Sequence, residues 1–214
     1  MRRVVPLFPL PKVWLFPYVV LPLHIFEDRY RRMIEDCLDG PGRIVLGTVE
    51  EGHEEDLAGA PPVYPVAGLG EIGRHVRLDD GRFNIWLVGL QRVHVREVES
   101  DKPYRQVETR PAEEIAVPRD REKALRENLV GAILERTKEL SSVPQQVPVS
   151  HLADLLILRT PLPQGILNEL YSELDSERRA QRALEEHAQR PRIELPEEGR
   201  SHPPGDPEPG SGEE

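Results

Sequence analysis

Apolar residues are concentrated at the start of the chain. The segment from Val4 to Phe26 is more apolar than any later stretch and holds five of the 22 prolines. Its pattern predicts short strands at 4–10, 13–16 and 19–25. Proline has no N–H to donate to a sheet, so the prolines should lie at edges or bends. We expect the first sheet and its core to form around this segment, with 19–25 as a buried strand and Pro22 at a bulge or edge.

A helix is predicted directly after these strands, over 26–38. Tyr30, Met33, Ile34 and Cys37 recur at the spacing of one helical face, and charged residues cover the other face. The Gly-Pro-Gly sequence at 40–42 should end the helix. Because Cys37 falls on the apolar stripe, we interpret it as a small buried hydrophobic residue rather than a reactive thiol.

Further strands are predicted up to residue 111, and they suggest a barrel. They cover 43–49, 63–69 continuing into 71–78, 82–88 continuing past Gly89 to 98, and 104–111. A turn at Asp79-Asp80-Gly81 joins two of them as a hairpin, and Gly89 should mark a bulge or sharp bend. About seven short strands and one helix within 4–113 predict a small, strongly bent barrel.

The pattern becomes helical after Pro118. Helices are predicted over 120–140, 150–158, 163–174 and 175–188, with Ser150 and Asp175 as N-caps. Residues 191–214 hold seven acidic residues against two arginines, and ten of these 24 residues are proline or glycine. Such a segment buries too little surface to offset its ordering entropy. We therefore predict an α+β protein with a β-barrel subdomain (1–115), a helical subdomain (116–190) and a disordered acidic tail (191–214).

Composition limits the possible partners and cellular locations of the protein. The formal net charge of −10 argues against a protein that binds nucleic acid by neutralising phosphates. A single cysteine allows no intrachain disulfide. The N-terminus begins like a signal peptide, but its prolines would break the apolar helix that a signal needs. No run of 18 apolar residues predicts a membrane span, and we expect a cytoplasmic protein.

The sequence has no convincing motif for catalysis, metal binding or cofactor binding. Gly68-Leu69-Gly70-Glu71-Ile72-Gly73 fits the spacing of a dinucleotide-binding loop. That loop must open a helix, however, and the turn at Asp79-Asp80-Gly81 leaves no room for one. We interpret these glycines as easing a bent strand. The chain has no P-loop and no zinc motif, and Lys138 and Ser141 lack an organised pocket. We predict no catalytic residue, metal ligand or cofactor, and no enzyme.

Two motifs resemble the Lon N-terminal domain, the substrate-binding domain of ATP-dependent Lon proteases. The first is Pro6-Leu7-Phe8-Pro9-Leu10, then Leu15-Phe16-Pro17, then Leu21-Pro22-Leu23. The second runs from Asp80-Gly81 to Leu87-Val88-Gly89-Leu90-Gln91-Arg92 and is similar to the family's D-G…V-x-G-x-x-R hairpin. The resemblance implies a PUA-like pseudo-barrel with a smaller helical subdomain, and a stand-alone protein without the ATPase and peptidase domains. Tyr18 departs from the family, which usually has glycine there.

These observations favour recognition of polypeptides. Alternation along 82–88 turns Trp86 away from Phe83, Ile85 and Leu87, so Trp86 and Val88 would be exposed or covered by the helical half at Leu125 or Leu129. Tyr18 would form a clasp with Trp14 or cap the end of the barrel. Our main hypothesis is an apolar binding patch for unfolded or tagged polypeptides. The candidate residues are Trp14, Tyr18, Trp86 and Val88. An acidic surface would favour basic or neutral clients.

Two other functions remain open from the sequence. A PUA-like protein that binds RNA or a small ligand would use a basic strip of Arg74, Arg77, Arg82 and Arg92 around the hairpin, although nucleic acid is not the partner we expect. An adaptor would dock on a separate ATP-dependent protease, with the acidic tail as a tether. In that case, deleting residues 191–214 should abolish capture of the partner without changing thermal stability.

Overall fold

A strand-rich half precedes a helical half along the chain. The computed structural model describes residues 3–56, 59–137 and 141–191. Most of the predicted tail lies outside these residues. The elements are β1 (Arg3–Pro11), β2 (Val20–Ile25), α1 (Asp28–Leu38), β3 (Arg43–Val49), β4 (Val66–Arg77), β5 (Phe83–Val98), β6 (Gln106–Pro111), α2 (Arg119–Arg136), α3 (Val149–Arg159), α4 (Gln164–Ser172) and α5 (Ser176–Gln189). The α+β class predicted from the sequence is confirmed.

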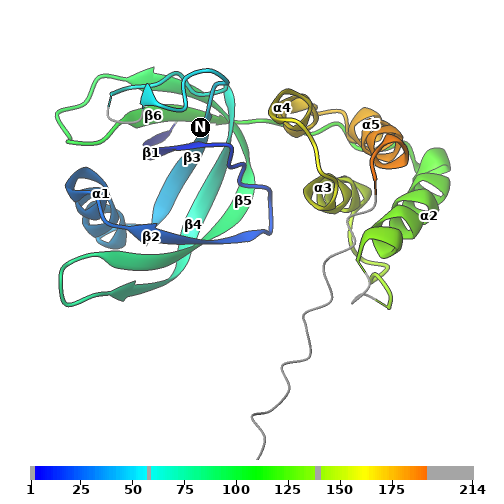
Figure 1. Cartoon of the computed structure of the whole chain (residues 1–214), viewed down its shortest axis with the longest axis horizontal. Coiled ribbons are helices and arrows are strands. Elements are labelled where there is room, and N and C mark those ends of the chain that lie inside the picture. The colour runs from blue at the N-terminus through cyan, green and yellow to red at the C-terminus, as the bar shows by residue number, and fades with distance from the viewer. Residues whose placement is uncertain (1–2, 57–58, 138–140, 192–214) are drawn as a thin grey trace, which may run out of the picture.

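The sheet closes on itself through its long fifth strand. The strand order is β2-β5-β4-β3-β1-β6, and β5 also pairs with β6. The second half of β5 completes the ring with β6, and its first half pairs with β2. Register shifts at Leu69/Gly70 and Ile72/Arg74 bend β4 against β5, as β-bulges do. The predicted bent barrel is therefore present, with β2 as an edge strand (Figure 1).

Strand β2 is less buried than its sequence predicts. Val20, Pro22 and His24 are exposed, and only Ile25 is fully buried. The prediction of a buried strand at 19–25 was wrong because β2 is covered on one face only. The prediction of an edge position for Pro22 is confirmed, and an edge strand tolerates the missing N–H.

The predicted strand at 13–16 does not form. Val13 to Phe16 have no regular secondary structure, yet Trp14, Leu15 and Phe16 are buried. This segment passes directly over the glycines of β4 and β5. A Cβ at Gly68 would lie 2.4 Å from the carbonyl oxygen of Leu15, and one at Gly89 would lie 2.0 Å from that of Phe16. The glycines are therefore required by close backbone approach, which confirms a structural role for Gly68 in β4.

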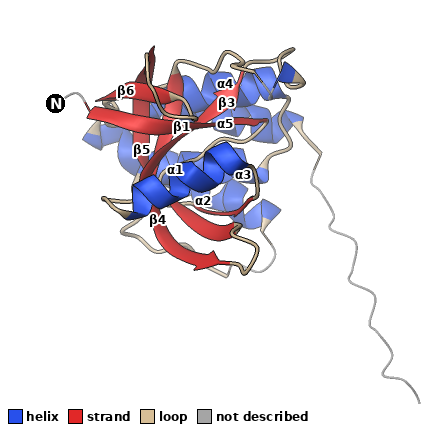
Figure 2. Cartoon of the chain, turned by 90° about the vertical axis from the view of Figure 1, so that its left-hand side faces the viewer, coloured by secondary structure: helices blue, strands red, loops and turns tan. Residues whose placement is uncertain are grey.

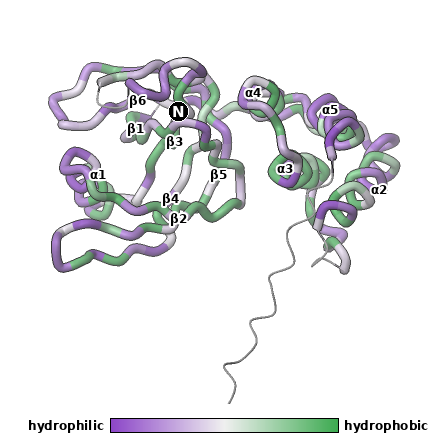
Figure 3. The backbone as a smooth tube through the Cα atoms, viewed as in Figure 1, coloured by the Kyte–Doolittle hydropathy of each residue, from purple (hydrophilic) through white to green (hydrophobic). Residues whose placement is uncertain are grey.

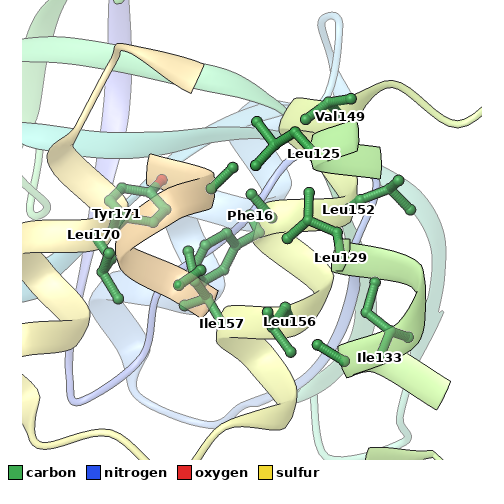
Figure 4. Close-up of a cluster of buried hydrophobic side chains, with 14 of the residues drawn as sticks. Phe16, Leu125, Leu129, Ile133, Val149, Leu152, Leu156, Ile157, Leu170 and Tyr171 are labelled. Carbon is green, nitrogen blue, oxygen red and sulfur yellow. The ribbon is translucent and has the colours of Figure 1, made fainter. Parts of the chain in front are cut away.

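Phe16 joins the two halves of the molecule. It is fully buried in a cluster with residues of α2, α3 and α4. Its ring meets that of Tyr171 edge to face at 4.9 Å, and the Tyr171 hydroxyl donates to the Leu15 carbonyl at 2.9 Å. Figure 4 shows Phe16 among the apolar residues of the helices. The helical half is thus packed on the barrel, and Figure 2 shows its helices behind the strands.

The hydropathy of the helices agrees with this packing. Most residues of α3 are buried, and in Figure 3 this helix is largely apolar, whereas α1, α2 and α5 carry longer polar stretches. The predicted cap at Ser150 is wrong, because Pro148 occupies the N-cap and the helix begins at Val149. The predicted cap at Asp175 is confirmed, since its carboxylate accepts from the backbone N–H groups of Glu177 and Arg178.

A buried group of charged residues also links the halves. Arg92 of β5 donates to both carboxylate oxygens of Asp154 in α3, at 2.7 and 3.0 Å, and to the Tyr171 carbonyl at 2.8 Å. Arg179 of α5 is fully buried, and its side chain and that of Arg92 each lie 2.9 Å from the same oxygen of Glu114. Burial alone would lower the pKa of Arg92, but the carboxylate of Asp154 raises it, so the guanidinium stays charged.

Cys37 is buried in α1, as predicted, and its environment should make the thiol unreactive. Burial, with a smaller contribution from Asp36, raises the pKa of its thiol to about 12. Because the thiolate is the reactive form, Cys37 should not react with a thiol reagent at pH 8 until the protein unfolds. The measurement is the rate of labelling by a chromogenic disulfide with and without denaturant. Rapid labelling of the native protein would contradict the burial of this side chain.

Candidate functional site

The three-stranded end formed by β2, β5 and β4 has two different faces. One face packs on α1. Its side chains alternate with those of the opposite face, as strand geometry requires. The cross-strand pairs on the α1 face are Leu21–Leu87, Leu23–Ile85 and Ile25–Phe83. Figure 1 shows α1 on this side of the strands. The first half of β5 therefore supplies the core with every second residue.

The opposite face carries a row of apolar side chains beside the polar pair His24–Asn84, and α1 does not cover it. Val20 pairs with Val88, and Pro22 pairs with Trp86. Side chains of directly paired residues leave a sheet on the same side, so these four lie together. Val20 and Pro22 are exposed, and Trp86 and Val88 are half-buried. We call this surface the outer strip. It consists of Tyr18, Val20, Pro22, Trp86, Val88 and Val76, which pairs with Asn84 on the same face and is exposed.

Tyr18 extends the outer strip toward the helical half. Its backbone N–H donates to the Gly89 carbonyl at 2.8 Å, one step beyond the Val20–Val88 pair. The side chain is 70% exposed, and its ring centre lies 4.3 Å from that of His151 in α3. Tyr18 has a φ of 65°, in the left-handed region that favours glycine. Glycine would adopt this backbone without strain, so the tyrosine here accepts strain while presenting a large ring.

Trp14 is not part of this surface. Only 8% of it is exposed, and it belongs to the cluster around Phe16. Its indole N–H points to the Asn168 side-chain oxygen at 3.5 Å. The prediction of an exposed patch or clasp that includes Trp14 was wrong, because the segment 13–16 turns inward between the barrel and the helices.

Trp86 is covered by an arginine rather than by the helical half. It does not belong to the cluster of Leu125 and Leu129. The Arg74 guanidinium lies over its ring, 4.8 Å from the ring centre. The outer strip thus combines aromatic and aliphatic surface with one stacked cation, an arrangement suited to holding apolar side chains of a partner.

The four arginines of the predicted basic strip do not all lie on one surface. Arg92 is buried in the ion-pair group between the halves. Arg77 lies on the α1 face and pairs with Glu35 at 3.1 Å. Arg82 pairs with Asp80 at 2.5 Å in the turn, and Arg74 lies on the outer strip. The prediction that Arg92 could contact RNA was wrong, and two of the other three are already neutralised by carboxylates.

A small ligand would find a different concave surface. A cleft of about 530 Å³ between α1 and the β5–β6 connection is lined by residues that include Tyr30 and Tyr104. Its cations are engaged by carboxylates. The ion pairs are Arg105–Glu97 at 2.6 Å, Lys102–Asp36 at 2.9 Å and Arg29–Glu27 at 2.9 Å. Among the described residues, no group of histidine, cysteine and acidic side chains is arranged to hold a metal ion.

Comparison with known proteins identifies the family. The model of the ATP-dependent protease La (LON) substrate-binding domain matches residues 4–188. The chain belongs to this family. Lon protease of Syntrophomonas wolfei is 26% identical over 151 residues, which cover 71% of this chain and 18% of the relative. Lon protease of Dictyoglomus thermophilum is 22% identical over 188 residues, covering 84% of this chain and 24% of the relative. The chain thus spans less than a quarter of these Lon proteases.

Solved structures show the same fold. The N-terminal domain of the Mycobacterium avium complex Lon protease superposes with a TM-score of 0.65 at 16% identity, covering 87% of this chain and 98% of that one. The Lon N-terminal domain protein from Xanthomonas campestris gives 0.62 at 22% identity, with 86% and 98% covered. Within the described ranges, this Lon substrate-binding domain has no helix that is long and apolar enough to cross a bilayer.

Sequence reasoning found half of the outer strip. It named Tyr18, Trp86 and Val88 but missed Val20, Pro22 and Val76. The missed signal was the alternation in Val20-Leu21-Pro22-Leu23-His24-Ile25, in which His24 marks one face as exposed. Because both faces are otherwise apolar, the segment reads as a buried strand until its position at the sheet edge is known.

Proposed function

We propose that the protein is a non-catalytic polypeptide-recognition module that binds exposed apolar segments of client proteins on the outer strip. The observation that carries this proposal is the row of apolar side chains around Trp86, on the side of the β2–β5–β4 end that α1 leaves uncovered. Membership of a substrate-binding family supports the same reading. Apolar client side chains would bury the strip, at roughly 25 cal/mol per Å² before the ordering costs.

Binding should use the face of β2 rather than its edge. An extended client could in principle add as a further strand beside β2. Pro22 lies in the middle of this six-residue strand and removes one N–H, which is a usual protection of edge strands. Side-chain contacts with the outer strip therefore carry the proposed affinity, which should be modest because the surface is small.

The proposed partners are unfolded or tagged polypeptides and a separate ATP-dependent protease that would degrade them. The first partner rests on the outer strip. The second rests on the relatives, which are named Lon protease. RNA binding is less well supported, because Arg92 is buried and Arg77 and Arg82 are paired with carboxylates.

Replacing Trp86 by alanine should weaken binding of an apolar peptide at least tenfold. The ring is the largest side chain of the strip, and interface tryptophans typically contribute more than about 1.4 kcal/mol. Fluorescence anisotropy with a labelled peptide from a peptide array measures the affinity, and circular dichroism checks the fold. Unchanged binding by a folded variant would remove Trp86 from the site. Leu158→Ala is the matched control, because Leu158 is exposed on α3 outside the strip.

Replacing Tyr18 by glycine separates binding from stability. Glycine removes the cost of a left-handed residue, about 1 kcal/mol, and the largely exposed ring loses its contact with His151. We expect weaker peptide binding with unchanged or higher stability, measured by chemical denaturation. A loss of stability with unchanged binding would instead assign Tyr18 to packing against the helical half.

A further inference from the structure

Arg74 differs from the other arginines of its hairpin. It pairs with Trp86 across β4 and β5, so its side chain leaves the sheet on the outer strip. Among the described residues it forms no ion pair, whereas Arg77 and Arg82 each lie within 3.1 Å of a carboxylate. Glu71, an acidic residue on the same face, is paired with Arg43 at 3.5 Å. The same face also carries His24 and Asn84, whose side chains are 2.7 Å apart, and the Arg82 guanidinium lies 3.3 Å from His24. Because Arg82 is paired with Asp80, Arg74 is the cation of this face that has no carboxylate partner in the described structure.

Stacking on Trp86 orients the Arg74 guanidinium so that it can bind a planar anion. A guanidinium that lies over an indole ring keeps the N–H groups at its edge available, and these groups match the two oxygens of a carboxylate. Hydrogen bonds between ionised partners are about twice as strong as neutral ones. A client that offers only apolar groups would leave Arg74 without a partner beside a newly dried surface, which disfavours binding.

We propose that Arg74 determines the specificity of the outer strip, by selecting apolar segments that carry a carboxylate beside the apolar core. The carboxylate is that of an aspartate or glutamate side chain or of a free C-terminus. This inference rests on the proposed function. It opposes the preference for basic or neutral clients expected from the net charge of −10. The charge nearest to the bound client should determine the preference, because salt screens exposed charges beyond about 8 Å at physiological ionic strength.

The test compares labelled peptides that share one apolar core. One has glutamate beside the core and an amidated C-terminus. The second has glutamine in place of glutamate, the third has glutamine with a free C-terminus, and the fourth has lysine. We expect the intact protein to bind one or both carboxylate peptides about tenfold more tightly than the amidated glutamine peptide. The two carboxylate peptides distinguish a side chain from a C-terminus as the source.

Two variants locate the effect. Arg74→Gln should remove the preference, and Arg77→Gln should keep it. Arg77 is the matched control because it lies on the same strand, covers the Phe83 ring at 5.5 Å and faces α1. Equal binding of the glutamine and both carboxylate peptides would overturn the role of Arg74 while leaving the proposed function intact. Absence of binding by every peptide would overturn both. Binding of single-stranded RNA that Arg74→Gln abolishes, with silent peptides, would also overturn the proposal and assign Arg74 to a phosphate.

Discussion

Replacing Asp154 by alanine should destabilise the protein by about 3–5 kcal/mol. Asp154 is 3% exposed and accepts two hydrogen bonds from the Arg92 guanidinium, which is equally inaccessible. Removing one partner of a buried ion pair leaves an uncompensated charge in the interior, and such changes are strongly destabilising. Glu114 would remain near Arg92 and Arg179, but one carboxylate cannot neutralise two buried guanidinium groups. Urea denaturation followed by circular dichroism measures the loss.

The control for this prediction is an exposed ion pair. Arg82→Ala removes the partner of Asp80 in the β4–β5 turn, where water replaces the lost contact. The urea midpoint of Arg82→Ala should stay close to that of the protein without a substitution. If Asp154→Ala also unfolded at the unchanged midpoint, the charged group between the halves would contribute nothing to their docking. A separate, earlier transition of the helical half would instead show that the group holds that half on the barrel.

Replacing Gly89 by alanine should destabilise the protein by about 3 kcal/mol or more. The new Cβ would lie 2.0 Å from the carbonyl oxygen of Phe16 and 3.0 Å from its carbonyl carbon. These are backbone atoms, so no side chain can rotate away, and the segment that carries Phe16 into the helical half must shift. Overpacking of a well-packed core typically costs 1–3 kcal/mol, and rigid neighbours raise that cost.

Gly131→Ala is the matched glycine control and should have the opposite sign. Gly131 lies inside α2, and a Cβ there would meet nothing within 4 Å. Alanine in an open helix interior is favoured over glycine by about 0.5–1 kcal/mol. Both variants are measured by the same denaturation. If Gly89→Ala were as stable as Gly131→Ala, the close approach of Phe16 to β5 would not be a constraint on the fold.

The elements that local patterns determined were those with one clearly buried face. The spacing of Tyr30, Met33, Ile34 and Cys37 predicted α1 and its buried stripe, and all four residues are buried. The alternation along 82–88 correctly placed Phe83, Ile85 and Leu87 in the core and Trp86 on the other face. Such predictions succeed because helical and strand periodicities are properties of the backbone itself.

Tertiary structure decided the positions for which two environments suit the same residue type. Trp14 and Tyr18 are aromatic residues four positions apart in one apolar segment, yet the first is buried and the second is 70% exposed. Nothing local distinguishes them, because their environments depend on how 13–16 crosses Gly68 and Gly89. The exposure of Val20 and Pro22 likewise depends on β2 being covered by α1 on only one face.

The arginines show most clearly which positions a local pattern can predict and which depend on tertiary packing. Arg74 and Arg77 are three residues apart, so strand alternation by itself puts them on opposite faces of β4. That much was available from the sequence. The burial of Arg92 was not, because its carboxylate partner Asp154 is 62 residues away and comes from a helix of the other half. Composition, periodicity and turn residues determined most of the elements and their order, although the strand predicted at 13–16 does not form. Long-range packing decided which apolar and charged side chains remain available to a partner, since burial depends on contacts between segments that are distant in the chain.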